Sequence, residues 1–330
     1  MKIPSARYLK KKAGNRLKDA KNARAIVAVY AGSLAVCSLI INIVQYLLDS
    51  QISQTGGLQG IGMRSALTTA NTVLPIVYAL LSVCLALGYC AAMLRIARGQ
   101  YVSVNTLRAG PERIWVLLRT KILEAVILIA MAIALLFLSI NVYMMTPLAT
   151  KFIAALAPLM EDGTLSTDAV LAAADTALGT VLPFFIVYFA VLLVLLWYFF
   201  AVYRMVDYLL IEKPQLGAIG ALRESRKLMR GNMMMLLRVD LSFWWYYLLQ
   251  LVTSVLLYLD VVLALCGVSL PMSDTAVYIL VVALYLAANF AVQFFFGNRL
   301  GATYALFYDS LCPRSAGSDN GAVLGSIFKA

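Results

Sequence analysis

Six long stretches that contain no Lys, Arg, Asp or Glu constrain the fold of this chain more than any other feature of its sequence. A membrane-spanning helix needs about 20 mostly apolar residues. In lipid, every backbone polar group must be satisfied within the segment, which favours helices. We therefore predict an all-α polytopic bundle of six transmembrane helices. The predicted spans are approximately 25–48, 67–94, 125–148, 180–203, 241–262 and 277–298.

The composition agrees with this class. The 330 residues are 62% hydrophobic and 13% charged, whereas soluble domains are about 45–50% apolar and about 25% charged. The first apolar stretch is longer than the roughly 7–15 apolar residues of a cleavable signal peptide, so we expect it to be retained. We divide the chain into a basic tail (1–24), a transmembrane domain (25–311) and a disordered tail (312–330).

The basic residues are distributed unevenly between alternate loops. If the six spans alternate in direction, 25 of the 27 Lys and Arg residues lie on the same side as the two termini. Only Arg64 and Lys151 lie on the other side. Short cytoplasmic loops carry an excess of Lys and Arg in membrane proteins. This pattern predicts that both termini are cytoplasmic.

The longest segment predicted to lie outside, 151–180, is rich in alanine. Its pattern predicts a short helix, with Ser166 as a possible N-cap and Gly179 as the residue that ends it. Such a helix could serve as a small lid over the outer face, or simply as a solvated linker. The solvated linker is the simpler of these two interpretations.

A strongly basic segment, ALRESRKLMRGN at 221–232, lies directly before the fifth apolar stretch. At 3.6 residues per turn its four cations fall within an arc of about 100°, opposite an apolar face. We therefore predict an amphipathic helix over Pro214–Arg230 at the cytoplasmic interface. The cations, which we expect to contact anionic headgroups or a partner membrane protein, are Arg223, Arg226, Lys227 and Arg230. The alternative is that these charges only fix the orientation of the chain.

Three motifs in this half of the chain carry a resemblance. They are S-x-x-L-M-R-G-N at Ser225–Asn232, L-S-F at Leu241–Phe243 and T-x-A-x-F-Y at Thr303–Tyr308. Together they resemble the bacterial integral membrane family catalogued as domain of unknown function 975. The resemblance implies a multi-pass protein of the bacterial plasma membrane and implies no reaction. The chain departs from the family pattern at Met233–Met235, where a basic or aromatic segment is expected.

The side chains that usually carry chemistry are scarce. There is no histidine, and the five cysteines have neither disulfide nor zinc spacing. We therefore expect no metal, no cofactor and no catalytic residue. Polar residues within the apolar stretches either bridge helices or line a pore. Those proposed for this role are Asn141, Gln250, Asn289 and Gln293.

These features favour a non-enzymatic membrane module, either a scaffold or an accessory subunit. Its basic cytoplasmic face would contact anionic lipid or a protein partner, with no role for nucleic acid. The alternative is a passive or weakly coupled transporter, which needs a polar path but no ionisable group within the membrane. A membrane enzyme would require a close carboxylate pair or a bound metal that the sequence does not reveal.

Overall fold

The computed structural model describes residues 4–54, 61–161, 167–259 and 274–312, and these residues form helices joined by short turns without any strand. The prediction of an all-α fold is therefore confirmed for this part of the chain. The long helices are α2 (Ala23–Gln54), α3 (Ile61–Ala97), α5 (Ile114–Met144), α6 (Pro147–Glu161), α7 (Thr167–Tyr203) and α13 (Asp274–Val292). The shorter ones are α1 (Ala6–Asp19), η2 (Val104–Arg108), α4 (Ala109–Glu112), α8 (Val206–Glu212), η3 (Pro214–Leu216), α9 (Gly217–Met229), α10 (Met233–Ser242), α11 (Trp244–Leu256), η4 (Gln293–Gly297) and α14 (Asn298–Leu311).

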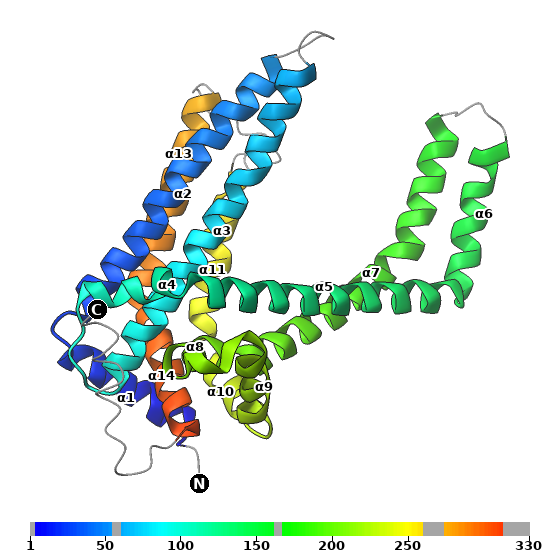
Figure 1. Cartoon of the computed structure of the whole chain (residues 1–330). Helices are drawn as coiled ribbons and strands as arrows, with labels where there is room; N and C mark the ends of the chain where they lie inside the picture. Colours follow the sequence, from blue (N-terminus) through cyan, green and yellow to red (C-terminus); the bar gives the residue numbers. More distant parts are fainter. Residues whose placement is uncertain (1–3, 55–60, 162–166, 260–273, 313–330) are drawn as a thin grey trace.

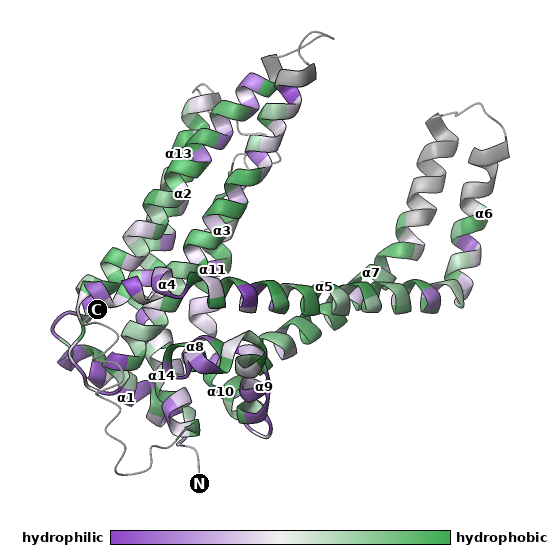
Figure 2. Ribbon diagram, viewed as in Figure 1, coloured by the Kyte–Doolittle hydropathy of each residue, from purple (hydrophilic) through white to green (hydrophobic). Residues whose placement is uncertain are grey.

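Four helices form an elongated bundle. α2, α3 and α13 run side by side, and α11 packs against α13 (Figure 1). Figure 2 shows that hydrophobic residues cover most of their length. Within the described residues, five helices are long and apolar enough to cross a membrane. Many of their large apolar side chains face outward, as expected for helices whose solvent is lipid.

A compact base closes one end of the bundle. It consists of α1, α8, α9, α10 and α14, together with the adjoining ends of α3 and α7. α14 is its central helix, and the side chains of Phe307 and Tyr308 are completely buried. α1 packs against α14 through Leu9 and Ala13. The segment predicted as a basic tail therefore contributes a folded helix to the base.

α5 and α7 extend away from the bundle, and α6 stands beside the first half of α7 at their far end (Figure 1). Pro183 lies inside α7, where a missing N–H and a ring clash favour bending. As viewed in Figure 1, α5 runs across the direction of α2 and α3. Beyond Glu124, α5 is apolar on all sides, and side chains such as Phe137 are exposed there. A helix of this kind requires an apolar solvent or partner.

Two further predictions made from the sequence differ from the structure. The expected fifth span is interrupted, because α10 ends at Ser242 and α11 starts at Trp244, with Phe243 buried at the bend. The part of that span beyond 259, like most of the predicted tail 312–330, lies outside the described residues. Gly179 does not end a helix, because α7 continues through it to Tyr203. The residues before Gly179 are rich in alanine and leucine, which are good helix formers, so the helix continues despite the glycine.

Candidate functional site

The four predicted cations of the basic segment lie together on the surface. Arg223, Arg226, Lys227 and Arg230 are all exposed and border one groove, whose other walls come from α7 and α10. Tyr198, Val202 and Met233 supply those walls, so the groove is cationic on one side and apolar on the other. Lys227 lies 3.5 Å from Glu224. Among the described residues, no ion pair joins a carboxylate to any of the three arginines.

The sequence places α9 in this position through its opposite face. The side chains of Ala221, Ser225 and Met229 are completely buried. The hydroxyl of Ser225 donates a hydrogen bond of 2.7 Å to the carbonyl of Val202. That carbonyl lies in the last turn of α7, where no intrahelical donor is available. Ser225 therefore joins α9 to the end of α7 and presents the basic face outward.

The Gly-Asn pair ends α9. Gly231 has φ +85°, a left-handed conformation that glycine adopts without strain. The side-chain amide of Asn232 donates to the carbonyl of Leu228 at 2.7 Å, and its backbone N–H bonds to the carbonyl of Met229 at 3.0 Å. The prediction that Gly231 terminates the amphipathic helix is confirmed. The observed helix begins after the 3-10 turn that contains Pro214.

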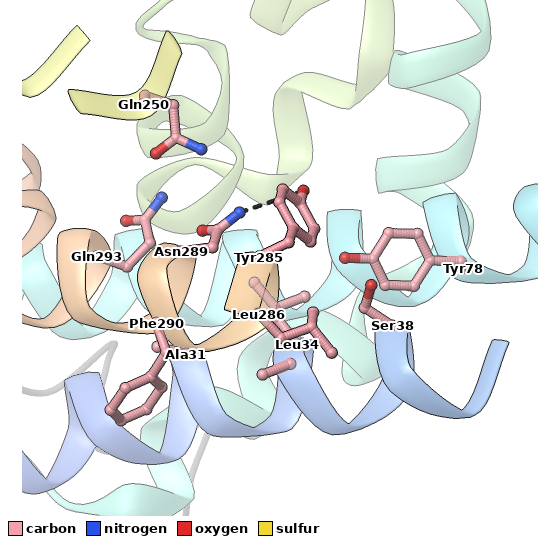
Figure 3. Close-up of a pocket in the computed structure, with 11 residues that line it drawn as sticks. Ala31, Leu34, Ser38, Tyr78, Gln250, Tyr285, Leu286, Asn289, Phe290 and Gln293 are labelled. Atoms are coloured by element: carbon pink, nitrogen blue, oxygen red, sulfur yellow. Dashed lines mark hydrogen bonds between the residues drawn. The ribbon is translucent and has the colours of Figure 1, made fainter. Parts of the chain in front are cut away.

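A second candidate site is a cavity between α2, α3, α11 and α13 (Figure 3). Gln250 on α11 lies opposite Asn289 and Gln293, which belong to α13 and η4. Ser38 on α2 and Tyr78 on α3 contribute hydroxyl groups to its lining. Three of the four intramembrane residues singled out by the sequence therefore share one cavity. The fourth, Asn141, does not.

Asn141 is exposed on α5, and its side-chain amide donates to the carbonyl of Phe137, one turn earlier, at 2.7 Å. Two of the other three amides bond to tyrosine hydroxyls instead. The Asn289 amide donates to the Tyr285 hydroxyl at 3.3 Å, and the Gln293 amide donates to the Tyr246 hydroxyl at 3.0 Å. Gln250, Asn289 and Gln293 thus share one cavity, and Asn141 lies apart from them on α5.

The base contains a buried ionic cluster that the sequence reasoning missed. The Arg98 guanidinium, at the end of α3, pairs with Glu212 on α8 and lies 3.0 Å from Asp309 on α14. The Tyr308 hydroxyl donates to Glu212 at 2.6 Å. Burial lowers the pKa of Arg98, but the two carboxylates outweigh this effect and raise it above its usual value. The guanidinium therefore stays charged and joins three helices.

A neighbouring cluster uses residues that lie within or next to two of the motifs. The Arg204 guanidinium donates to the Tyr304 hydroxyl at 2.6 Å and lies over the ring of the same tyrosine. The Tyr304 hydroxyl in turn donates to Asp240. On the other side of α10, Lys10 donates to the carbonyl of Ser242 at 2.6 Å and lies over the Phe243 ring. The available signals were the Y-x-x-x-Y-D spacing in α14 and the arginines that close α3 and α7.

These clusters explain the three motifs as structural elements. Ser225 and Gly231 position the basic helix, Ser242 and Phe243 hold α1, and Tyr308 completes the ionic cluster. Within the described part of the chain, no group of three or more His, Cys, Asp or Glu residues could hold a metal ion. The charged residues of these two clusters thus join helices, whereas the four cations of α9 face outward.

Comparison with known proteins gives one match. Neither the curated proteins nor the solved structures gave a match. The model of one family matches residues 9–311, a range that begins within α1 and ends with the last residue of α14. The matched range therefore covers both the base and the bundle, and the family is described as "Protein of unknown function (DUF975)". On this match, the chain belongs to the DUF975 family.

Proposed function

We propose that this protein is a non-enzymatic module of the bacterial plasma membrane that binds anionic lipid headgroups in the groove beside α9. In this proposal the chain crosses the bilayer six times and has both termini in the cytoplasm. The groove then lies at the inner interface, where anionic lipids are concentrated. The observation that carries the proposal is the shared exposure of Arg223, Arg226, Lys227 and Arg230 beside an apolar wall.

The composition of the groove fits a phospholipid better than a soluble anion. Tyr198 and Val202 belong to α7, one of the helices long enough to cross a membrane. A lipid headgroup that meets the cations would therefore place its acyl chains along an apolar helix. Each Lys or Arg near an anionic surface contributes about 1 kcal/mol, so the four cations give an upper limit of roughly 4 kcal/mol, reduced by salt.

The six crossings place a demand on the arm formed by α5 and α7. A bilayer with a hydrocarbon core of about 30 Å can be crossed by these helices only if they lie closer to the direction of α2 and α3 than Figure 1 draws them. Their apolar surface on all sides favours such a position in lipid. The basic residues, which gather in the base and the loops beside it, favour the cytoplasm for both termini.

The test is to replace all four groove cations with glutamine. Wild-type and variant protein are reconstituted in nanodiscs of phosphatidylcholine with a minor fraction of phosphatidylglycerol, and the lipids retained after mild extraction are quantified by mass spectrometry. We expect the wild type to retain phosphatidylglycerol preferentially and the variant to lose that preference. The proposal fails if the enrichment is unchanged.

A matched control removes the same charge from another surface of the base. Arg7, Lys11, Lys12 and Lys18 are exposed on α1, away from the groove. Their replacement by glutamine should leave the enrichment of phosphatidylglycerol at half or more of its wild-type value. Equal loss in both variants would indicate attraction by net charge alone, which contradicts a defined groove. Retention of a companion protein without any lipid preference would favour a scaffold over a lipid-binding module.

A passive transporter is the second candidate function. One observation favours it, namely that Gln250, Asn289 and Gln293 line one cavity within the bundle. Transport would additionally require that this cavity connects in turn to both sides of the membrane. Flux of a small neutral solute into proteoliposomes, compared between wild type and a Gln250→Leu variant, tests this candidate. Equal flux in protein-free vesicles would reject it.

A further inference from the structure

The cavity of Figure 3 has the dimensions of a site for a small molecule. Its volume is about 190 Å³. An engineered apolar cavity of about 150 Å³ holds one benzene molecule, so this cavity can accept a ligand of about seven non-hydrogen atoms. It differs from such a cavity in its polar lining, which includes Ser38, Tyr78 and three side-chain amides.

One polar atom in the cavity lacks a partner. The side-chain oxygen of Gln250 is buried and accepts no hydrogen bond from the protein. A buried acceptor without a donor costs about 1–3 kcal/mol, so rotation of the Gln250 amide toward a molecule in the cavity that brings an O–H or N–H group would be favourable. The neighbouring amides of Asn289 and Gln293 are already oriented by Tyr285 and Tyr246. They form a fixed polar wall opposite Gln250 (Figure 3).

The backbone beside the cavity forms a π-helical turn, and this turn positions the Gln293 amide in the wall. Gln293 begins η4, a turn of π-helix between α13 and α14. Such π-bulges occur frequently at functional sites. A Cβ at Gly297 would lie 2.3 Å from the side-chain oxygen of Gln293. Glycine at this position therefore provides the space that the Gln293 amide occupies.

The lining also restricts the charge of a ligand. Its residues are apolar, hydroxyl-bearing or amide-bearing, and none carries a formal charge. An ion placed in an apolar environment without a counter-charge loses far more solvation than uncharged dipoles return. The site therefore discriminates against anions and cations alike and favours a neutral molecule with both a donor and an acceptor.

From these observations we propose that the α2–α3–α11–α13 cavity is a binding site for a small neutral solute, such as a short amide or a polyol. Its donor group pairs with the Gln250 amide once that side chain turns toward the cavity, and its acceptor faces Asn289. The proposal concerns binding and does not depend on the anionic-lipid groove of α9. It supplies a substrate class if the protein proves to be a transporter.

The experiment uses saturation-transfer NMR on the full chain in nanodiscs. The probes are acetamide and glycerol, with acetate and methylammonium as charged molecules of similar size, and empty nanodiscs give the background. We expect saturation of the two neutral probes only. Absence of transfer to both neutral probes would mean that the cavity holds water alone, and equal transfer to the charged probes would mean that it does not select by charge. Either result overturns the proposal.

Variants locate the site. Gln250→Leu and Asn289→Leu should weaken the binding of acetamide at least tenfold, because each removes an amide from the lining. Gly297→Ala should also weaken it by displacing the Gln293 amide. Asn141→Leu is the matched control, since Asn141 does not line the cavity and its side-chain amide bonds to Phe137 of the same helix. Unchanged binding in the cavity variants, or equal loss in the control, rejects the assignment. If one variant does not fold, the others and the wild-type probe comparison still decide the question.

Discussion

The replacement of Arg98 by methionine tests whether the ionic cluster holds the base together. Methionine keeps much of the aliphatic stem and removes the guanidinium. The Arg98 side chain is 6% exposed, Glu212 is 19% exposed and Asp309 is 36% exposed. After the substitution Glu212 retains only the hydrogen bond from Tyr308. A largely buried carboxylate that has lost its cation in this way strongly destabilises the folded state.

The magnitude follows from the burial of each partner. Removal of one member of a buried ion pair costs about 3–5 kcal/mol. The pair with Asp309 adds little, because solvent screens a carboxylate that is more than one third exposed. We therefore expect Arg98→Met to lower the free energy of unfolding by about 3 kcal/mol, almost all of it from Glu212.

The assay is equilibrium unfolding in mixed micelles with increasing dodecyl sulfate, followed by tryptophan fluorescence. Adding Glu212→Gln to Arg98→Met should restore at least about 1 kcal/mol, because the unpaired charge is then removed. Arg108→Met is the control, since Arg108 is exposed in η2 and should change stability by no more than about 0.5 kcal/mol. A loss below about 1 kcal/mol for Arg98→Met, or no recovery in the double variant, would refute this account.

Three further predictions concern the basic helix and the topology. Ser225→Ala should lower the free energy of unfolding by about 1–2 kcal/mol, because the carbonyl of Val202 loses its buried donor; no change in the same micelle titration would contradict this role. Gly231→Ala should cost about 1 kcal/mol from backbone strain alone, as no atom lies within 4 Å of the added Cβ, and a stabilised variant would argue against the left-handed turn. In a variant background without other cysteines, Met145→Cys should react with an impermeant maleimide in intact cells, whereas Val104→Cys should react only after permeabilisation; the reverse pattern would overturn the proposed orientation. Both positions are exposed.

Local features of this chain could be read from the sequence because their physical causes are local. The apolar stretches predict helices, since a helix satisfies its own backbone in lipid. The spacing of Arg223, Arg226 and Lys227 predicts one exposed face, and Gly231 predicts where that helix ends. The three motifs were identified by their resemblance to a family, and the match over residues 9–311 confirms that resemblance.

Contacts between distant parts of the chain were decided only by the tertiary structure. Arg98 is separated from Glu212 by 114 positions and from Asp309 by 211 positions. Hydropathy shows that a helix is long enough to cross a membrane but does not show how it rotates about its axis or which helix it meets. For that reason the sequence could not separate Asn141, which contacts its own helix, from Gln250, which faces the cavity. The same reason explains why the N-terminal basic segment, whose charges predicted only a cytoplasmic tail, proved to contain a helix packed on α14.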